Sequence, residues 1–230
     1  IERKGEKYIL KKAVDASKDQ SYVLYDLTQE KLARVKFPLG GLHKTDAREI
    51  AAEAGLINAR KHDSQDICFV PDGDYAKIIV QRTGKTPQPG PFLDLDGNVV
   101  GTHRGIIHYT VGQRRGLALP AGEKIYVVKI LPERNAVVVG PDSALYTSEC
   151  LVSNMHWISG EAPALPYRCS AKTRYRQPEK PCTVYPAGEN AVRLVFDEPL
   201  RAITPGQSAV LYDGEIVLGG GIIAREDAPC

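Results

Sequence analysis

The feature that most constrains the fold is the last third of the chain, where short apolar segments alternate with turn residues. From about residue 151 onward there is almost no helix signal. Alternating apolar and polar residues are typical of strands, and Asp213-Gly214 is typical of a two-residue hairpin turn. The predicted strands are residues 167–176, 191–196, 208–212 and 215–218. Several short strands joined by regular turns predict a small closed antiparallel β-barrel.

Helices are expected mainly in the first part of the chain. Residues 7–14 predict a strand, after which Ser17 or Asp19 can cap a short helix that runs through Leu27. Thr28 can cap a second short helix that buries Leu32. A third helix is the clearest: Thr45 can cap it, its apolar stripe is Ala47, Ile50, Ala51 and Ala54, and Gly55 ends it.

The proline-rich segment 87–91 marks a domain boundary. A helix around residues 75–81 precedes it, and hairpins at 94–101 and 125–140 follow it. We therefore predict an α+β protein in which short N-terminal helices are followed by a small mixed central domain and the barrel. The expected domains are residues 1–72, 73–145 and 146–230.

Composition excludes several classes of protein and site. The 230 residues carry a formal net charge of only +2, so attraction to nucleic acid must come from local clustering of cations. The five cysteines are irregularly spaced without a C-x-x-C pair, and the five histidines show no metal-ligand spacing. A disulfide framework or a metal site is therefore not expected. No apolar run is long enough to span a membrane, which favours a cytoplasmic protein.

Cys68 is the candidate reactive thiol. It lies in the polar, acidic segment 64–69, about a dozen residues after the predicted helix stop at Gly55. A thiol that works on a substrate needs exposure and groups that favour its thiolate, and a loop provides the exposure. A cysteine that merely packs as a small apolar residue is the alternative from the residues alone.

The predicted strand 167–176 is the candidate nucleic-acid surface. From residue 167 to residue 182 one negative charge, Glu179, faces five positive ones, which are Arg168, Lys172, Arg174, Arg176 and Lys180. Period-two geometry places Arg174 on the basic face and Tyr175 on the opposite face, where it could be a core residue. Clustered cations can neutralise phosphates and a tyrosine can stack on an unpaired base. A solvated strand face is the alternative.

Two further segments have two interpretations each. Lys18, Asp19 and Gln20 stand at a predicted helix start, whose free N–H groups could bind a phosphate, but Asp19 could simply cap the helix. The glycine run 219–221 lacks the strand-to-helix context of a phosphate loop, so close backbone packing in a strand explains it better.

Five motifs in fixed order give this chain a close resemblance to the tRNA-specific 2-thiouridylases. The resemblance extends from about residue 4 to about residue 224, and such a set is far more specific than one short pattern. The motifs are Ser17-Lys18-Asp19-Gln20-Ser21-Tyr22, Phe37-Pro38-Leu39-Gly40, Ser64-Gln65-Asp66-Ile67-Cys68-Phe69, Tyr109-Thr110-Val111-Gly112-Gln113-Arg114 and Thr204-Pro205-Gly206-Gln207.

The resemblance implies a sulfurtransferase that thiolates the wobble uridine of tRNAs for Lys, Glu and Gln at position 2. Cys68 matches the cysteine that carries the persulfide, which a cysteine desulfurase or a sulfur-relay protein loads. ATP activates the uridine carbonyl. The implied tRNA contacts are Lys18, Asp19, Gln20, Arg174, Tyr175 and Gln207.

One departure from the family pattern is large. The Ser-Gly-Gly-x-Asp-Ser motif of the ATP-binding PP-loop domain does not occur in these residues, nor does the family's other catalytic cysteine, which precedes the residues of this chain. The resemblance therefore implies that residues 1–72 are the last part of that domain, and that this chain alone is inactive. A non-catalytic RNA-binding β-barrel module is the competing function. RNA methyl transfer is a third, but no glycine-rich strand-to-helix turn offers a methyl-donor site.

Overall fold

The computed structural model describes residues 1–61, 75–119 and 124–225. It confirms the α+β class. The chain divides into two compact units, one containing residues 1–61, 148–199 and 204–230, and the other containing residues 62–147 and 200–203. Cys68 lies outside the described residues.

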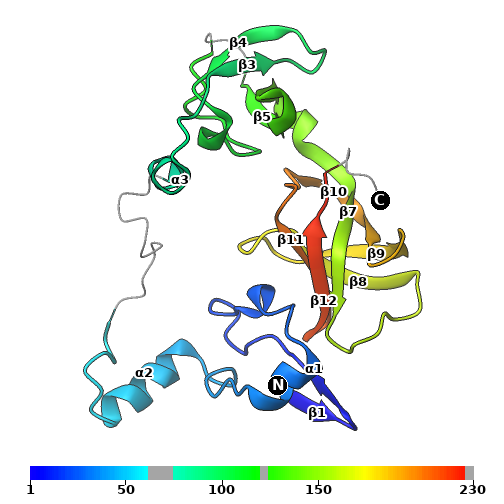
Figure 1. The fold of residues 1–230 in the computed structure, drawn as a ribbon. Helices are drawn as coiled ribbons and strands as arrows, with labels where there is room; N and C mark the ends of the chain where they lie inside the picture. The colour runs from blue at the N-terminus through cyan, green and yellow to red at the C-terminus, as the bar shows by residue number, and fades with distance from the viewer. Residues whose placement is uncertain (62–74, 120–123, 226–230) are drawn as a thin grey trace. The chain divides into compact units, whose positions relative to one another are not determined.

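A closed six-stranded barrel forms the centre of the first unit, as predicted (Figure 1). Its strands follow the order β10-β7-β12-β11-β8-β9 around the barrel. They are β7 (Tyr146–Trp157), β8 (Tyr167–Lys172), β9 (Lys180–Pro186), β10 (Val192–Arg201), β11 (Ser208–Asp213) and β12 (Ile216–Ile223). The cross-strand pairs Leu194–Val184 and Phe196–Cys182 are buried, which is how one face of each strand supplies the core.

The glycine run of β12 confirms close backbone packing. A Cβ atom at Gly219 would lie 2.0 Å from the His156 carbonyl oxygen, and one at Gly220 would lie 2.6 Å from the Ala209 carbonyl oxygen. Neighbouring backbones therefore fill the space that a phosphate would need. This segment is a tightly packed strand and not a nucleotide loop.

The N-terminal segment covers the outside of β11 and β12, and Figure 1 shows it in blue beside the red strand β12. Leu10, Tyr22 and Leu32 pack in one buried cluster with Val210 and Tyr212 of β11. The Val217 N–H also donates to the Leu10 carbonyl oxygen at 2.9 Å. Because one face of β11 belongs to the barrel interior, this cover explains why residues 209–212 are all buried. The elements of the segment are β1 (Glu2–Lys4), β2 (Lys7–Ile9), the 3-10 turn η1 (Ser21–Val23), α1 (Gln29–Arg34) and α2 (Lys44–Glu53).

The structure corrects two local predictions in this segment. The strand expected at 7–14 is only β2, and the helix expected to run through Leu27 is only the turn η1. Tyr22 causes the second difference, because its side chain is buried against the barrel. The second helix is confirmed: α1 buries Leu32, and its cap Thr28 accepts from the Lys31 N–H at 3.3 Å.

The third predicted helix, α2, is confirmed in extent but not in its cap. His43 is the N-cap residue, while the Thr45 hydroxyl donates to the Asp46 carboxylate at 3.0 Å. Gly55 follows the helix with a φ of +69°, a left-handed conformation typical of glycine at a helix end. The predicted apolar stripe is not covered by the described residues, since Ile50 is 53% exposed.

The second unit contains a four-stranded sheet in the order β4-β3-β6-β5, in which β3 and β6 are parallel and the other pairs are antiparallel. Both predicted hairpins are confirmed, one joining β3 to β4 and the other joining β5 to β6. Phe92, Val127 and Val137 form the buried centre. The elements are α3 (Tyr75–Thr83), β3 (Gly90–Leu93), β4 (Val99–His103), η2 (Ile106–His108), β5 (Tyr126–Leu131), η3 (Pro132–Arg134), β6 (Ala136–Gly140) and η4 (Asp142–Leu145).

Candidate nucleic-acid interface

The turn between β8 and β9 carries Arg174 and Tyr175. The strand ends at Lys172, four residues earlier than predicted, because a local turn replaces the ladder. In this turn the Gln177 N–H donates to the Arg174 carbonyl oxygen at 3.2 Å, and the Thr173 hydroxyl donates to the Gln177 side-chain oxygen at 2.8 Å. Tyr175 therefore does not belong to the alternating pattern of the strand. The prediction that it could be a core residue is wrong, because Tyr175 is 43% exposed.

A second turn, between β10 and β11, lies beside the first. The Arg174 guanidinium donates to the Thr204 hydroxyl at 2.7 Å. The Gln207 N–H donates to the Thr204 carbonyl oxygen at 3.2 Å, which closes a four-residue turn. Pro205 at its second position and Gly206 at its third, with a φ of +85°, are typical of a type II turn, where the third residue must tolerate positive φ. The turn leaves the Gln207 residue exposed.

Tyr22 joins these turns to the N-terminal segment. Its hydroxyl donates to the Ser208 carbonyl oxygen at 2.7 Å, and its ring meets the ring of Tyr175 edge-to-face with the centroids 5.9 Å apart. Burial raises the pKa of Tyr22 to about 12, with a smaller raising effect from Tyr25 and an opposing effect from Arg174. Sequence reasoning missed this residue as part of the interface, although it lies two positions after Gln20.

The loop that carries Lys18, Asp19 and Gln20 is held by the Asp19 carboxylate. One carboxylate oxygen accepts from the N–H groups of Ala13 and Ser21, both at 3.1 Å, and the other accepts from the Ser21 hydroxyl at 2.7 Å. The Asp19 carboxylate thus holds the loop, but the capping interpretation is not confirmed, because the N-cap residue of η1 is Gln20 and no side chain caps the turn. The phosphate argument from a helix start is wrong, because η1 is a single 3-10 turn. Lys18 and Gln20 are exposed on either side of Asp19.

The structure brings the candidate tRNA contacts into one neighbourhood. Arg174 contacts the turn of Gln207, and Tyr175 contacts Tyr22, which follows the Lys18–Gln20 loop. We call this region the three-turn surface. Its members are Lys18, Gln20, Arg174, Tyr175 and Gln207.

The positively charged surface at the edge of the barrel is smaller than the sequence predicts. Arg168 binds both carboxylate oxygens of Asp197, and Lys180 lies 3.7 Å from the Glu198 carboxylate. The hydrogen bond from Arg168 lowers the pKa of Asp197 below its usual value. Both carboxylates belong to strand β10. A count of charges along residues 167–182 alone therefore overlooks them. Arg174 and Arg176 lie in the turn, beyond these pairs.

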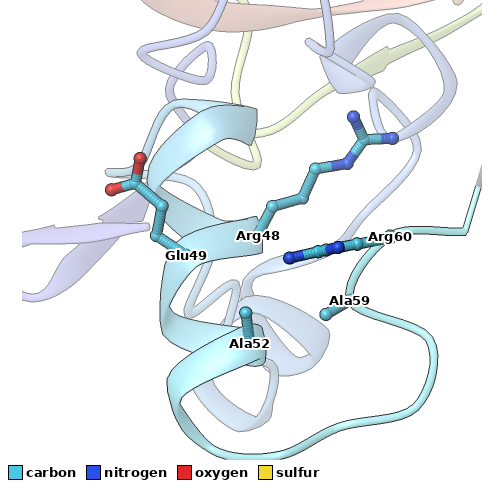
Figure 2. Close-up of a pocket in the computed structure, with 5 residues that line it drawn as sticks. All are labelled: Arg48, Glu49, Ala52, Ala59 and Arg60. Atoms are coloured by element: carbon cyan, nitrogen blue, oxygen red, sulfur yellow. The ribbon is translucent and has the colours of Figure 1, made fainter.

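A shallow pocket of about 300 Å³ lies between α2 and the segment that follows it (Figure 2). Its lining residues are Arg48, Glu49, Ala52, Ala59 and Arg60, and Figure 2 shows the Arg48 and Glu49 side chains projecting to opposite sides of α2. Arg48 also donates to the Lys61 carbonyl oxygen at 3.2 Å. Two guanidinium groups at one pocket can bind an oxyanion such as a phosphate. This pocket was not predicted from the sequence, because only the turn after α2 brings Arg48 and Arg60 to the same pocket.

Within residues 1–61, 75–119 and 124–225, no group of three or more His, Cys, Asp or Glu residues could hold a metal ion. His103 has a structural role: it accepts from the Gly105 N–H at 3.0 Å and its ring contacts Phe92 and Tyr109. In the same part of the chain, no helix has the length and apolar character needed to cross a bilayer.

Comparisons with known proteins match most of the chain. The tRNA methyl transferase HUP domain model matches residues 1–72, the tRNA methyl transferase PRC-barrel domain model matches residues 77–141, and the aminomethyltransferase beta-barrel domain model matches residues 147–223. The tRNA-specific 2-thiouridylase MnmA of Symbiobacterium thermophilum is 49% identical over 219 residues, or 95% of this chain and 56% of that protein. The chain belongs to the tRNA-specific 2-thiouridylase family.

Two other family members show the same relationship. The 2-thiouridylase MnmA of Acetivibrio thermocellus is 49% identical over 94% of this chain and 60% of its own length. The MnmA of Halothermothrix orenii is 45% identical over 94% of this chain and 61% of its own length. The chain thus spans 56% to 61% of the length of these three 2-thiouridylases.

Proposed function

We propose that this chain carries the persulfide cysteine and the tRNA-binding surface of a tRNA-uridine 2-sulfurtransferase. Cys68 would carry the sulfur that is transferred to position 2 of the wobble uridine in tRNAs for Lys, Glu and Gln. The relatives named tRNA-specific 2-thiouridylase support the reaction class. In this proposal residues 1–72 complete the catalytic domain, and residues 73–145 and 146–230 are the central and barrel domains.

The observation that carries the tRNA part of the proposal is the meeting of three turns. The Arg174 guanidinium donates a 2.7 Å hydrogen bond to the Thr204 hydroxyl, which restricts the conformations of the Arg174 side chain. The Tyr175 ring packs against the Tyr22 ring on one side, and Tyr175 is 43% exposed. An ordered cation beside an exposed ring suits single-stranded RNA, because the cation neutralises a phosphate and the ring stacks on an unpaired base. Lys18, Asp19, Gln20 and Gln207 complete the proposed contacts.

Cys68 is the proposed sulfur carrier because its segment matches the family motif. A thiolate there would accept sulfur from a cysteine desulfurase or a sulfur-relay protein, forming a persulfide whose outer sulfur is the nucleophile. The described cysteines suit this role less well. Burial, for example, raises the pKa of Cys150 to about 12, which keeps it protonated.

ATP does not fit the described residues. The glycine run of β12 is filled by neighbouring backbone, and the Arg48–Arg60 pocket lacks a glycine-rich loop. We propose that ATP, which the family resemblance implies, is bound by residues outside this chain, and we derive no step through it.

Two other functions remain to be compared with this one. The family models are named for methyl transfer, but the described residues provide no glycine-rich strand-to-helix turn for a methyl donor. A non-catalytic RNA-binding barrel would use the three-turn surface with Cys68 as a bystander.

The test is thiolation by the complete enzyme, meaning this chain joined to the rest of its catalytic domain. We expect Cys68→Ser to abolish formation of 2-thiouridine, measured by mass spectrometry of digested tRNA, while tRNA affinity stays unchanged. Cys230→Ser is the control and should remain active. Full thiolation by Cys68→Ser would refute the sulfur-carrier role, and methylated uridine as the product would favour methyl transfer.

A further inference from the structure

Two cysteines face each other across the hairpin that presents the three-turn surface. Cys169 on β8 and Cys182 on β9 are direct partners in the antiparallel ladder, and their sulfur atoms are 3.9 Å apart. Directly opposite residues of antiparallel strands have Cα atoms about 4.5–5.5 Å apart, which lies inside the range that a disulfide bridges. A bond between these sulfurs therefore needs side-chain rotation and no movement of the strands.

The surroundings of the pair favour one thiolate. The S–H of one cysteine can donate to the sulfur of the other, so the pKa of Cys182 is lowered by the hydrogen bond from Cys169 and further by Arg168. The pKa of Cys169 is raised, chiefly because that hydrogen bond would be lost and because the thiol is partly buried. The first proton of the pair is therefore lost more easily than the second. Cys150, the remaining described cysteine, stays a thiol.

Exposure gives the two cysteines different roles. Cys169 is partly exposed, whereas Cys182 is fully buried. A small molecule can therefore reach the pair only at Cys169, and Cys182 lies behind it in position to respond. This is the arrangement of an attacking thiol and a resolving thiol.

We propose that Cys169 and Cys182 are a reversible dithiol–disulfide pair that small disulfides oxidise. As the Cys169 proton passes to the Cys182 sulfur 3.9 Å away, the Cys169 sulfur attacks one sulfur of the small disulfide, breaks its S–S bond and forms a mixed disulfide, releasing one small thiol. Cys182 sulfur then attacks Cys169 sulfur and releases the second small thiol. Two protein S–H bonds are lost and one protein S–S bond is formed. The small disulfide is reduced to two thiols, which take both protons.

The ring that this bond closes contains the whole β8–β9 turn. Residues 170–181 lie between the two cysteines, and they include Arg174 and Tyr175. Oxidation would therefore fix the base of the hairpin covalently without touching the exposed side chains. The proposal itself concerns the barrel and does not depend on Cys68 or on sulfur transfer.

Peptide mapping of the 230-residue chain tests it. The protein is incubated with oxidised glutathione, free thiols are blocked with N-ethylmaleimide, and tryptic peptides are analysed by mass spectrometry. Trypsin separates the two cysteines, because it cuts after Arg168, Lys172, Arg176 and Arg193. We expect residues 169–172 and 177–193 as one linked species that dithiothreitol separates. Oxidised protein should also unfold at a higher temperature than reduced protein.

Variants make the result specific. Cys150→Ser should retain the linked species and Cys169→Ser should lose it, with glutathione then absent from buried Cys182. Recovery of both wild-type peptides as separate alkylated species under conditions that oxidise other thiols would overturn the proposal. Linkage of Cys182 to Cys68 or Cys150 would overturn it as well. The wild-type map decides the question even where a variant folds poorly.

Discussion

Replacing Tyr175 with alanine separates an RNA-stacking role from a structural one. The ring is 43% exposed and makes one aromatic contact, with Tyr22, at 5.9 Å between centroids. Losing such a pair costs about 0.5–1.5 kcal/mol of folding free energy, which a folded barrel tolerates. Losing a stacked base costs about 1–3 kcal/mol of binding free energy, which is a drop in affinity of about 5- to 140-fold.

The assay is binding of a tRNA transcript at one fixed salt concentration, followed by fluorescence anisotropy. Circular dichroism and urea unfolding first establish that the variant is folded. Tyr175→Phe keeps the ring and should bind like the wild type, while Tyr185→Ala is a matched control. Tyr185 also lies beside an arginine, Arg193, but at the far end of β9 from the turn.

The reasoning fails if Tyr175→Ala is folded and binds tRNA as tightly as the wild type. It fails equally if Tyr185→Ala loses the same affinity, since the effect would then be general to barrel tyrosines. A loss of affinity that is matched by unfolding would assign Tyr175 to the fold.

Two further predictions follow from the same surface. Arg174→Ala should reduce the slope of log affinity against log salt by about 0.7–0.9 if the side chain neutralises one phosphate, whereas Arg193→Ala should leave the slope unchanged. Tyr22→Phe should remove part of the loss of stability at high pH. Because the folded pKa is raised from 10.0 to about 12, the phenol stabilises the fold below pH 10 and that contribution is lost as pH rises to about 12. Equal urea midpoints for Tyr22→Phe and wild type across this interval, after normalisation at pH 8, would contradict it.

Short sequence patterns were sufficient to predict the elements that form from residues close together in the chain. The Thr28 cap and buried Leu32 predicted α1, and alternation predicted the barrel strands β8, β10, β11 and β12 and both hairpins of the second unit, but not the barrel strands β7 and β9. These features depend on neighbours in sequence, so their residue types carry the information.

Distant contacts decided the features that the sequence could not show. Tyr22 is drawn to the Ser208 carbonyl, 186 positions away, and this favours a turn over the expected helix. Asp197 of β10 pairs with Arg168 of β8 and offsets its charge. The face of β8 that the sequence predicts to be basic is therefore less basic in the structure. The motif match predicted Arg174, Tyr175 and Gln207 as a group, but only the three-dimensional contacts show how the turns meet.

The most direct test of the central claim is the site of sulfur loading. The 230-residue chain is incubated with a cysteine desulfurase and sulfur-labelled cysteine, and its tryptic peptides are analysed without reduction. Residues 62–77 form a peptide whose single cysteine is Cys68. We predict one labelled sulfur on this peptide, released by dithiothreitol and absent in Cys68→Ser. Label on the peptides of Cys150, Cys169 or Cys182 with an unmodified Cys68 would contradict the account.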